Sequence, residues 1–226
     1  MYFCLRVDLD YVPWDTPDAG EFGHGEPAVL LRLLEVAKAT GYRFHFFASN
    51  RFLRAFPAGG DTILGDGHDL DWLCKYPEQA EERYLASREL FDSIKHVAVG
   101  LATREVWPSD YAPFPGLAEN RFLSSPAGFV PPGLIHFPVE ARAAREAMRA
   151  GMNVRAWTDA SKRQLRESGS RRKGTTLVVR PQVLARYDPK LNHIREILDI
   201  ASAVGIPVKT LRELTKESEE PGNPTA

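Results

Sequence analysis

The sequence predicts a single α/β domain built on a largely parallel sheet or barrel. Short apolar runs typical of strands alternate along the chain with longer segments of helical periodicity. No internal repeat or low-complexity linker divides the 226 residues, 43% of which are apolar. A chain of this length and composition can bury a substantial core, so a disordered or fibrous chain is excluded.

The first predicted strand is a short apolar run that ends in two acids. Residues Tyr2 to Val7 form the run, and Asp8-Leu9-Asp10 follow. Further strands are expected at 44–48, within 62–73, at 96–101, near 121–125 and 134–137, at 176–179 and at 207–209.

The predicted helices carry apolar residues at helical spacing. The first, at 27–40, has Val29, Leu30 and Leu33 on one face and ends before Gly41. Others are expected at 78–94, 141–150, 161–167 and 190–203. We therefore expect residues 1–214 to form one domain and residues 215–226 to be a polar, disordered tail.

Charge and cysteine content exclude several functional classes. Lys and Arg number 29 against 30 Asp and Glu, a net charge of −1, which argues against a nucleic-acid module held by bulk positive charge. No apolar run approaches the roughly 20 residues that a membrane span needs. Cys4 and Cys74 are too few for a disulfide framework. Because no secretory leader is recognisable, we expect a cytoplasmic protein with reduced cysteines.

The residues at the predicted strand ends are the candidate site residues, because sites in parallel α/β folds lie at the carboxyl ends of strands. Asp8 and Asp10 are two apart on a strand and point to the same face. Such a pair can hold a hard metal or divide into base and ligand, and the alternative is a pair that caps a nearby helix. Asp71, near the end of the third strand, is placed to join them.

Arginines and aromatic residues also fall at this end of the predicted sheet. Arg104 opens the loop after the fourth strand and is placed to pair with a carboxylate. Arg180 ends the strand at 176–179. Four aromatic residues are candidates to stack on a sugar, with core packing as the alternative for each: Trp14, Trp72, Trp107 and Tyr111.

In order and spacing these residues resemble the polysaccharide deacetylase family, the NodB-homology domain of carbohydrate esterases. The resemblance runs from about residue 3 to residue 214. It rests on the acids of the first strand, on Arg104, and on five short motifs: Phe44-His45-Phe46-Phe47, Gly67-His68-Asp69-Leu70, Phe122-Leu123-Ser124-Ser125, His136-Phe137-Pro138-Val139 and Arg180-Pro181.

The resemblance implies a distorted (β/α) barrel of the polysaccharide deacetylase type and a metal-dependent deacetylation. In such a protein Asp8 would be the general base, Arg104 would brace it, and Asp10 would be a metal ligand. A divalent metal, zinc by family resemblance, would polarise the acetamide carbonyl and bind the attacking water. The substrate would be an N-acetylated sugar or glycan precursor, and the reaction would belong to carbohydrate metabolism.

The sequence departs from the family pattern at three histidine positions. Leu73 and about Pro77 stand where the two metal-binding histidines would be, and Arg180 stands where the histidine that protonates the leaving amine would be. Asp71 could compensate by completing an all-oxygen site with Asp8 and Asp10, which would favour magnesium or calcium over zinc. Arg180 cannot act as a general acid near neutral pH, but it can hold an anionic group.

Three hypotheses follow, and the sequence leaves enzymatic activity open. The first is a deacetylase acting on an N-acetylated sugar. The second is an inactive relative, with no metal, that binds a glycan or assists a glycan-biosynthesis complex. The third is hydrolysis of a different carbon–nitrogen bond, with the pocket directed by Arg180 towards an anionic substrate.

Overall fold

The computed structural model describes residues 1–10, 26–110 and 114–220. In this part of the chain seven parallel strands form one sheet in the order β6-β5-β4-β3-β2-β1-β7. The two edge strands, β6 and β7, contact each other, so the sheet is a nearly closed barrel and the predicted fold class is confirmed. The strands are β1 (Tyr2–Leu9), β2 (His45–Ala48), β3 (Asp69–Leu73), β4 (Gly100–Ala102), β5 (Phe122–Ser125), β6 (Ile135–Pro138) and β7 (Gly174–Val179).

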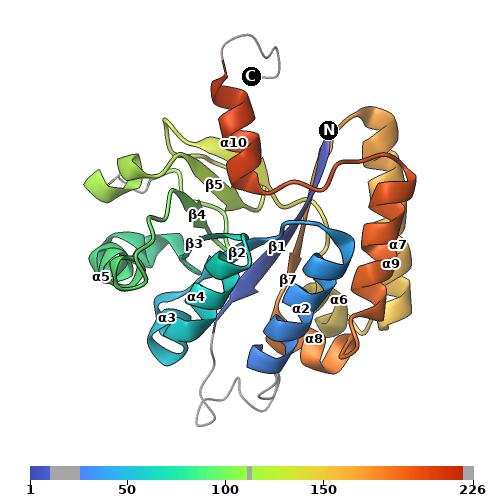
Figure 1. The fold of residues 1–226 in the computed structure, drawn as a ribbon. Helices are drawn as coiled ribbons and strands as arrows, with labels where there is room; N and C mark the ends of the chain where they lie inside the picture. The colour runs from blue at the N-terminus through green and yellow to red at the C-terminus, as the bar shows by residue number, and fades with distance from the viewer. Residues whose placement is uncertain (11–25, 111–113, 221–226) are drawn as a thin grey trace.

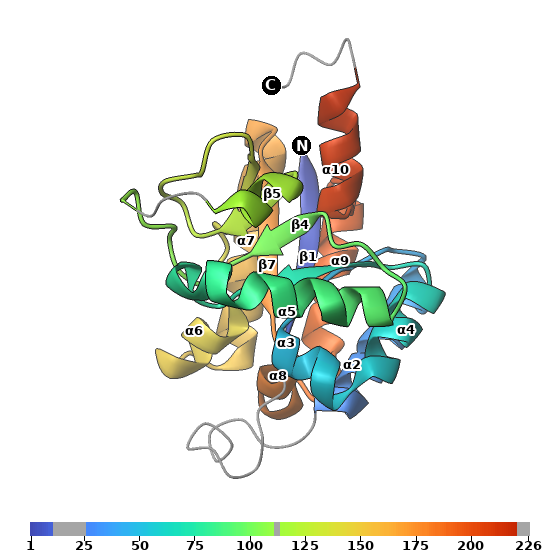
Figure 2. The ribbon, with the colours of Figure 1, turned by 90° about the vertical axis from the view of Figure 1, so that its left-hand side faces the viewer.

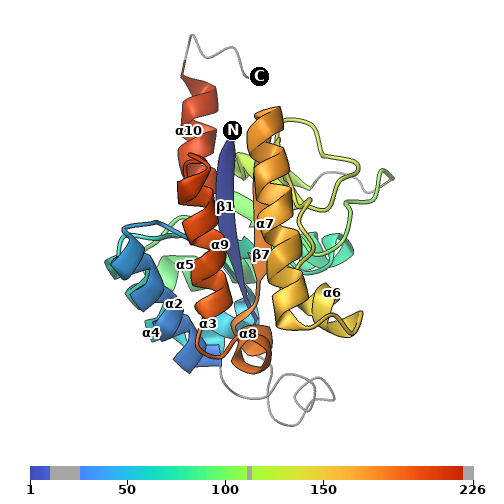
Figure 3. The same cartoon turned by 90° about the vertical axis from the view of Figure 1, so that its right-hand side faces the viewer.

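Helices cover the outside of the barrel and its amino end. In Figure 1, β1 runs downward from the N-terminus, α10 lies beside its start, and α8 lies at the opposite end. Figure 2 shows α5 on the side of the barrel that faces the viewer, and Figure 3 shows α7 and α9 side by side. The helices are α2 (Glu26–Thr40), α3 (Asn50–Ala55), α4 (Pro57–Gly65), α5 (Ala80–Ser93), α6 (Ala144–Arg149), α7 (Val154–Arg171), α8 (Pro181–Tyr187), α9 (Asn192–Ala203) and α10 (Leu211–Glu219).

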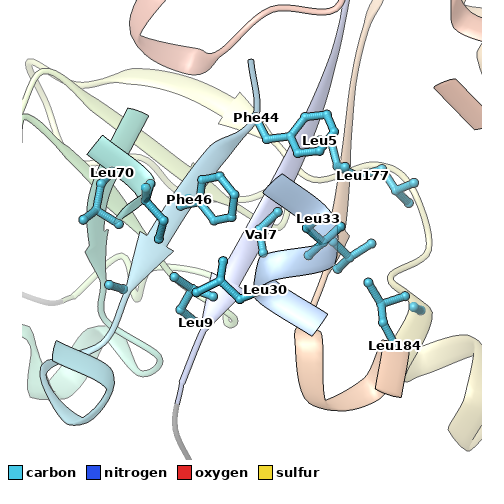
Figure 4. Close-up of a cluster of buried hydrophobic side chains, with 14 of the residues drawn as sticks. Leu5, Val7, Leu9, Leu30, Leu33, Phe44, Phe46, Leu70, Leu177 and Leu184 are labelled. Carbon is cyan, nitrogen blue, oxygen red and sulfur yellow. The ribbon is translucent and has the colours of Figure 1, made fainter. Parts of the chain in front are cut away.

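The main core lies between the outer face of the barrel and the helices. Alternate residues of β1, namely Phe3, Leu5, Val7 and Leu9, point into it. Figure 4 shows three of them packed with Phe46 of β2 and with side chains of α2, β3 and β7. Because the odd-numbered residues of β1 take the outer face, Cys4, Arg6 and Asp8 are directed into the barrel.

The interior of the barrel holds an apolar cluster beside charged side chains. Phe47, Leu73 and Phe122 pack in this cluster with Leu211 and Leu214 of α10, the helix that lies beside the start of β1. A capping box at Thr210 and Glu213 starts α10 and fixes its direction. Arg6 and Asp8 of β1 face the same interior, and Asp8 lies near the carboxyl end of its strand.

Several elements differ from the sequence prediction. Residues 207–209 do not form a strand and contribute a single bridge, Phe3 to Val208. Helices α3, α4 and α8 were not predicted, and α7 is longer than the predicted 161–167 because the Asn153 side chain caps it at Ala156.

The predicted tail is partly helical. Residues 215–219 belong to α10, Thr215 is buried, and Arg121 forms an ion pair with Glu219. Residues 221–226 lie outside the described part of the chain. Cys4 and Cys74 are both buried and unpaired. No helix among the described residues combines the length and apolar character needed to cross a membrane.

Candidate functional site

Asp8, near the carboxyl end of β1, is fully buried and held by two arginines. Arg6 donates to both of its oxygens, from Nε to Oδ1 at 2.7 Å and from Nη2 to Oδ2 at 3.2 Å. Arg104 donates from Nε to Oδ2 at 3.3 Å. Burial alone would raise the pKa of Asp8, but the two guanidinium groups outweigh it and hold the pKa below its ordinary value.

Arg6 is itself buried and fixed by the neighbouring strands. It donates to the backbone carbonyl of Ser124 at 2.8 Å, to the Ser124 hydroxyl at 3.1 Å and to the carbonyl of Thr103 at 3.1 Å. Its guanidinium carbon lies 5.2 Å from the centre of the Phe47 ring. Asp8 is therefore held in position, and its ionised form is favoured.

Asp10 is bound to two further cations. Lys75 forms an ion pair with its Oδ2, and Arg104 donates from Nη1 to the same oxygen at 3.2 Å. The Ser49 hydroxyl donates to Oδ1 at 3.1 Å. Burial opposes ionisation here too, but Arg104 and Lys75 hold the pKa of Asp10 below its ordinary value. Arg104 thus bridges Asp8 and Asp10, whereas the resemblance implies only a contact with Asp8.

A buried carboxyl group lies behind Asp10. Glu26, the first residue of α2, accepts a hydrogen bond from the Asp10 backbone N–H at 3.0 Å and one from the Gln182 amide at 2.6 Å. The same amide donates to the Asp10 carbonyl. Burial raises the pKa of Glu26 to about 8, so this group is mostly protonated at neutral pH.

Two cavities adjoin the carboxylates. The larger, about 260 Å³, is lined by Asp10, Lys75, Arg104 and Arg180, among others. The smaller, about 30 Å³, is lined by Asp8 and shares Arg104 and Arg180 with the larger one. The predicted site residues Asp8, Asp10, Arg104 and Arg180 are therefore brought together.

The structure does not bring Asp71 to this cluster. In the strand register, Phe47 of β2 lies between Asp8 and Asp71 and fills the interior. The Asp71 carboxylate instead accepts from Arg212 at 2.6 and 2.8 Å, from His45 at 3.0 Å and from two backbone N–H groups of the segment leading into β4. The all-carboxylate site expected from the sequence is not formed.

The two predicted aromatic platforms that the structure describes do not line these cavities. Trp72 and Trp107 are buried in the main core, and the Trp72 indole N–H donates to the Asn50 side chain. The core-packing alternative therefore describes both. Trp14 and Tyr111 lie outside the described residues.

The described residues around the carboxylates do not fit a divalent metal. The described residues contain no group of three or more His, Cys, Asp and Glu side chains able to hold one. Leu73 packs in the apolar interior. Both oxygens of Asp8 and of Asp10 already accept hydrogen bonds, and side-chain cations supply the positive charge beside them.

Sequence reasoning missed four members of the site: Arg6, Glu26, Lys75 and Gln182. One of them had a signal. Arg6 lies in an apolar strand two residues before Asp8, so both share a face, and a buried arginine needs a carboxylate. The other three come from separate segments that only the folded chain places around Asp10.

Comparison with known proteins establishes the fold. The sequence matches no protein-family model and no curated protein. A protein from Mycobacterium smegmatis described as a polysaccharide deacetylase superposes with a TM-score of 0.73 at 14% identity, over 96% of this chain and 89% of that one. The PuuE allantoinase superposes with a TM-score of 0.73 at 11% identity, over 98% and 92%.

A CE4-family pseudoenzyme from Bacillus anthracis has the same fold. It superposes with a TM-score of 0.58 at 10% identity, over 95% of this chain and 65% of that one. The chain thus has the polysaccharide deacetylase fold that its motifs indicate. At these identities the likeness defines the fold, and the chemistry must be argued from the site.

Proposed function

We propose that the protein binds an N-acetylated sugar or glycan precursor at the carboxyl end of the barrel and hydrolyses its amide carbon–nitrogen bond. The observation that carries the proposal is the convergence of Asp8, Asp10 and Arg104 beside a cavity of about 260 Å³. Two structures with this fold are described as a polysaccharide deacetylase and an allantoinase. We place the reaction in the cytoplasm, where unpaired Cys4 and Cys74 stay reduced.

The proposed roles use only side chains of the site. Asp8, held ionised by two arginines, accepts a proton from a water in the small cavity as that water attacks the carbonyl carbon. Arg104 faces the cavity and stabilises the negative charge that develops on the carbonyl oxygen. Lys75, whose pKa burial lowers, gives a proton from Nζ to the departing nitrogen as the carbon–nitrogen bond breaks.

A second candidate function is binding without turnover, as in the hypothesis of an inactive relative. Its supporting observation is the pairing of Asp10 with both Lys75 and Arg104, which occupies the carboxylate that the resemblance implies is a metal ligand. The fold also includes a protein described as a pseudoenzyme.

The experiment is an assay of acetate release from N-acetylglucosamine and its short β-1,4-linked oligomers. We expect release to fall at least about 100-fold in Asp8→Asn, the loss typical of a removed general base. The surface change Asp61→Asn on α4 serves as the matched control and should leave the rate unchanged. Binding without release by the wild type would support the second candidate.

Treatment with a chelator tests separately whether the side chains of the site catalyse the hydrolysis without a metal. We expect the rate to survive prolonged incubation with EDTA, because Lys75, Arg104 and Arg180 supply the positive charge. A rate that is lost with EDTA and restored by zinc would contradict this mechanism and favour a metal-dependent deacetylase.

A further inference from the structure

The large cavity is lined by more basic than acidic side chains. Five basic residues line it: Lys75, Arg104, Arg145, Arg149 and Arg180. The acids on its wall are Asp10, Glu105 and Glu146. Asp10 is already neutralised by Lys75 and Arg104, so the charge that remains towards the cavity is positive.

Arg180 has a buried hydrogen-bond donor that lacks an acceptor among the described residues. It lies at the boundary between β7 and α8 and lines both cavities. Its Nε is buried and has no hydrogen-bond partner in the described part of the chain. The ion pairs among the described residues also give Arg180 no carboxylate within 4 Å, because Arg6 and Arg104 already hold Asp8.

A buried guanidinium Nε that lacks an acceptor, on an arginine with no ion-paired carboxylate among the described residues, is costly, and an oxyanion is its natural complement. Burial, followed by the nearby charge of Arg104, lowers the pKa of Arg180 to about 9, which reflects the same lack of compensation. The planar guanidinium binds a carboxylate or a phosphate through two parallel hydrogen bonds. A ligand carrying such a group would relieve the unpaired charge and gain affinity.

We propose that this cavity is an anion-binding subsite in which Arg180 binds a carboxylate or phosphate group carried by the sugar substrate. The inference rests on the proposed function and narrows its substrate class from neutral to acidic N-acetylated sugars. Arg145 and Arg149 of α6 line the same wall and add to the positive field around the bound group.

Calorimetric titration with three matched sugars tests the subsite and distinguishes the two anions. N-acetylglucosamine is the neutral probe, N-acetylglucosamine 1-phosphate carries a phosphate, and N-acetylmuramic acid carries a carboxylate. We expect at least one acidic probe to bind about tenfold or more tighter than the neutral one, the gain expected for one charge-assisted hydrogen bond. Inorganic phosphate should compete if the phosphate arm is correct.

Two variants locate the anion. Arg180→Gln should remove the preference for the acidic probe, and Arg180→Lys should restore part of it. Arg149→Gln, at an exposed position of α6, should reduce the preference without disturbing the core. Arg163→Gln, exposed on α7, is the matched control.

The outcomes separate this inference from the proposed function. Equal binding of all three probes, or an acidic preference that persists in Arg180→Gln, would overturn the subsite. Tight binding of an acidic probe without acetate release would support the subsite and overturn the hydrolysis. Thermal unfolding of each variant shows whether a lost preference merely reflects a lost fold.

Discussion

Arg6→Met is the sharpest test of the buried ion cluster. The side chain is 1% exposed and donates to five acceptors, two on Asp8, two on Ser124 and one on Thr103. Methionine keeps much of the volume but leaves the Asp8 carboxylate with Arg104 alone. Breaking a buried pair in this way costs about 3–5 kcal/mol, and the two abandoned carbonyls add to it.

The expected loss is large enough to read in a thermal scan. About 4 kcal/mol corresponds to a fall in melting temperature of roughly 8–16 °C for a chain of this size. Asp8→Leu and the double variant Arg6→Met/Asp8→Leu complete a double-mutant cycle with Arg6→Met and the wild type. We expect the double variant to be less destabilised than the sum of the two single variants by about 2 kcal/mol, because each single change strands a charge.

The pH dependence gives a second readout. In the wild type the pKa of Asp8 lies below its ordinary value of 3.8, so its contribution is present above that value and is lost as the pH falls through the folded-state pKa. Without Arg6 the pKa rises, and the deficit of the variant should shrink as the pH falls from 7 towards 4. A deficit below about 1 kcal/mol at pH 7, or additive single variants, would refute the reasoning.

Three other changes test the remaining buried groups. The pKa of Glu26 is about 8 against an ordinary value of 4.5, so between these values the folded state holds a proton that the unfolded state has lost, and the free energy of unfolding should fall by about 1.4 kcal/mol per pH unit. Urea unfolding of Glu26→Gln at several pH values should show no such slope, and an unchanged slope would contradict this explanation. Asp71→Ala should cost about 3–5 kcal/mol by stranding Arg212, measured by urea unfolding, whereas a loss within experimental error would show that the pair is dispensable. Burial raises the pKa of the Cys4 and Cys74 thiols, that of Cys74 to about 12. Neither thiol should therefore react with a thiol reagent at pH 8 until the chain unfolds. Rapid labelling of either cysteine in the folded protein would contradict this prediction.

The sequence predicted the elements whose residues carry a clear local pattern. The apolar run of β1 predicted its position and the acids at its end, because a strand buried on both faces is typically a nearly continuous apolar run. Residues 50–65 form two helices that the sequence concealed, since Pro57, Gly59 and Gly60 are typical of turns. Gly59 and Gly60 are buried against other side chains, where a Cβ would be crowded, so packing decides their conformation.

The site was predictable only in part for a related reason. The acids and Arg104 follow strand ends, so a rule about strand ends finds them. The same rule misplaced Asp71, because it does not consider which residue lies between two strands, and here that residue is Phe47. Lys75 reaches Asp10 from a different strand end, a pairing fixed by strand order rather than by any local motif.

Lys75 connects the two properties proposed for the site, independence from a metal and selection of an anion. Its ammonium group forms an ion pair with Oδ2 of Asp10 and also adds positive charge to the cavity wall. Lys75→Gln should therefore lower the affinity for the acidic sugar probe and raise the affinity of Asp10 for a divalent cation. Calorimetric titrations of the variant with the probe and with the cation measure both changes. If Lys75 serves only to stabilise the fold, both titrations will match the wild type and only the melting temperature will fall. The two titrations therefore show whether Lys75 only stabilises the fold through its ion pair or also determines which ligands the site binds.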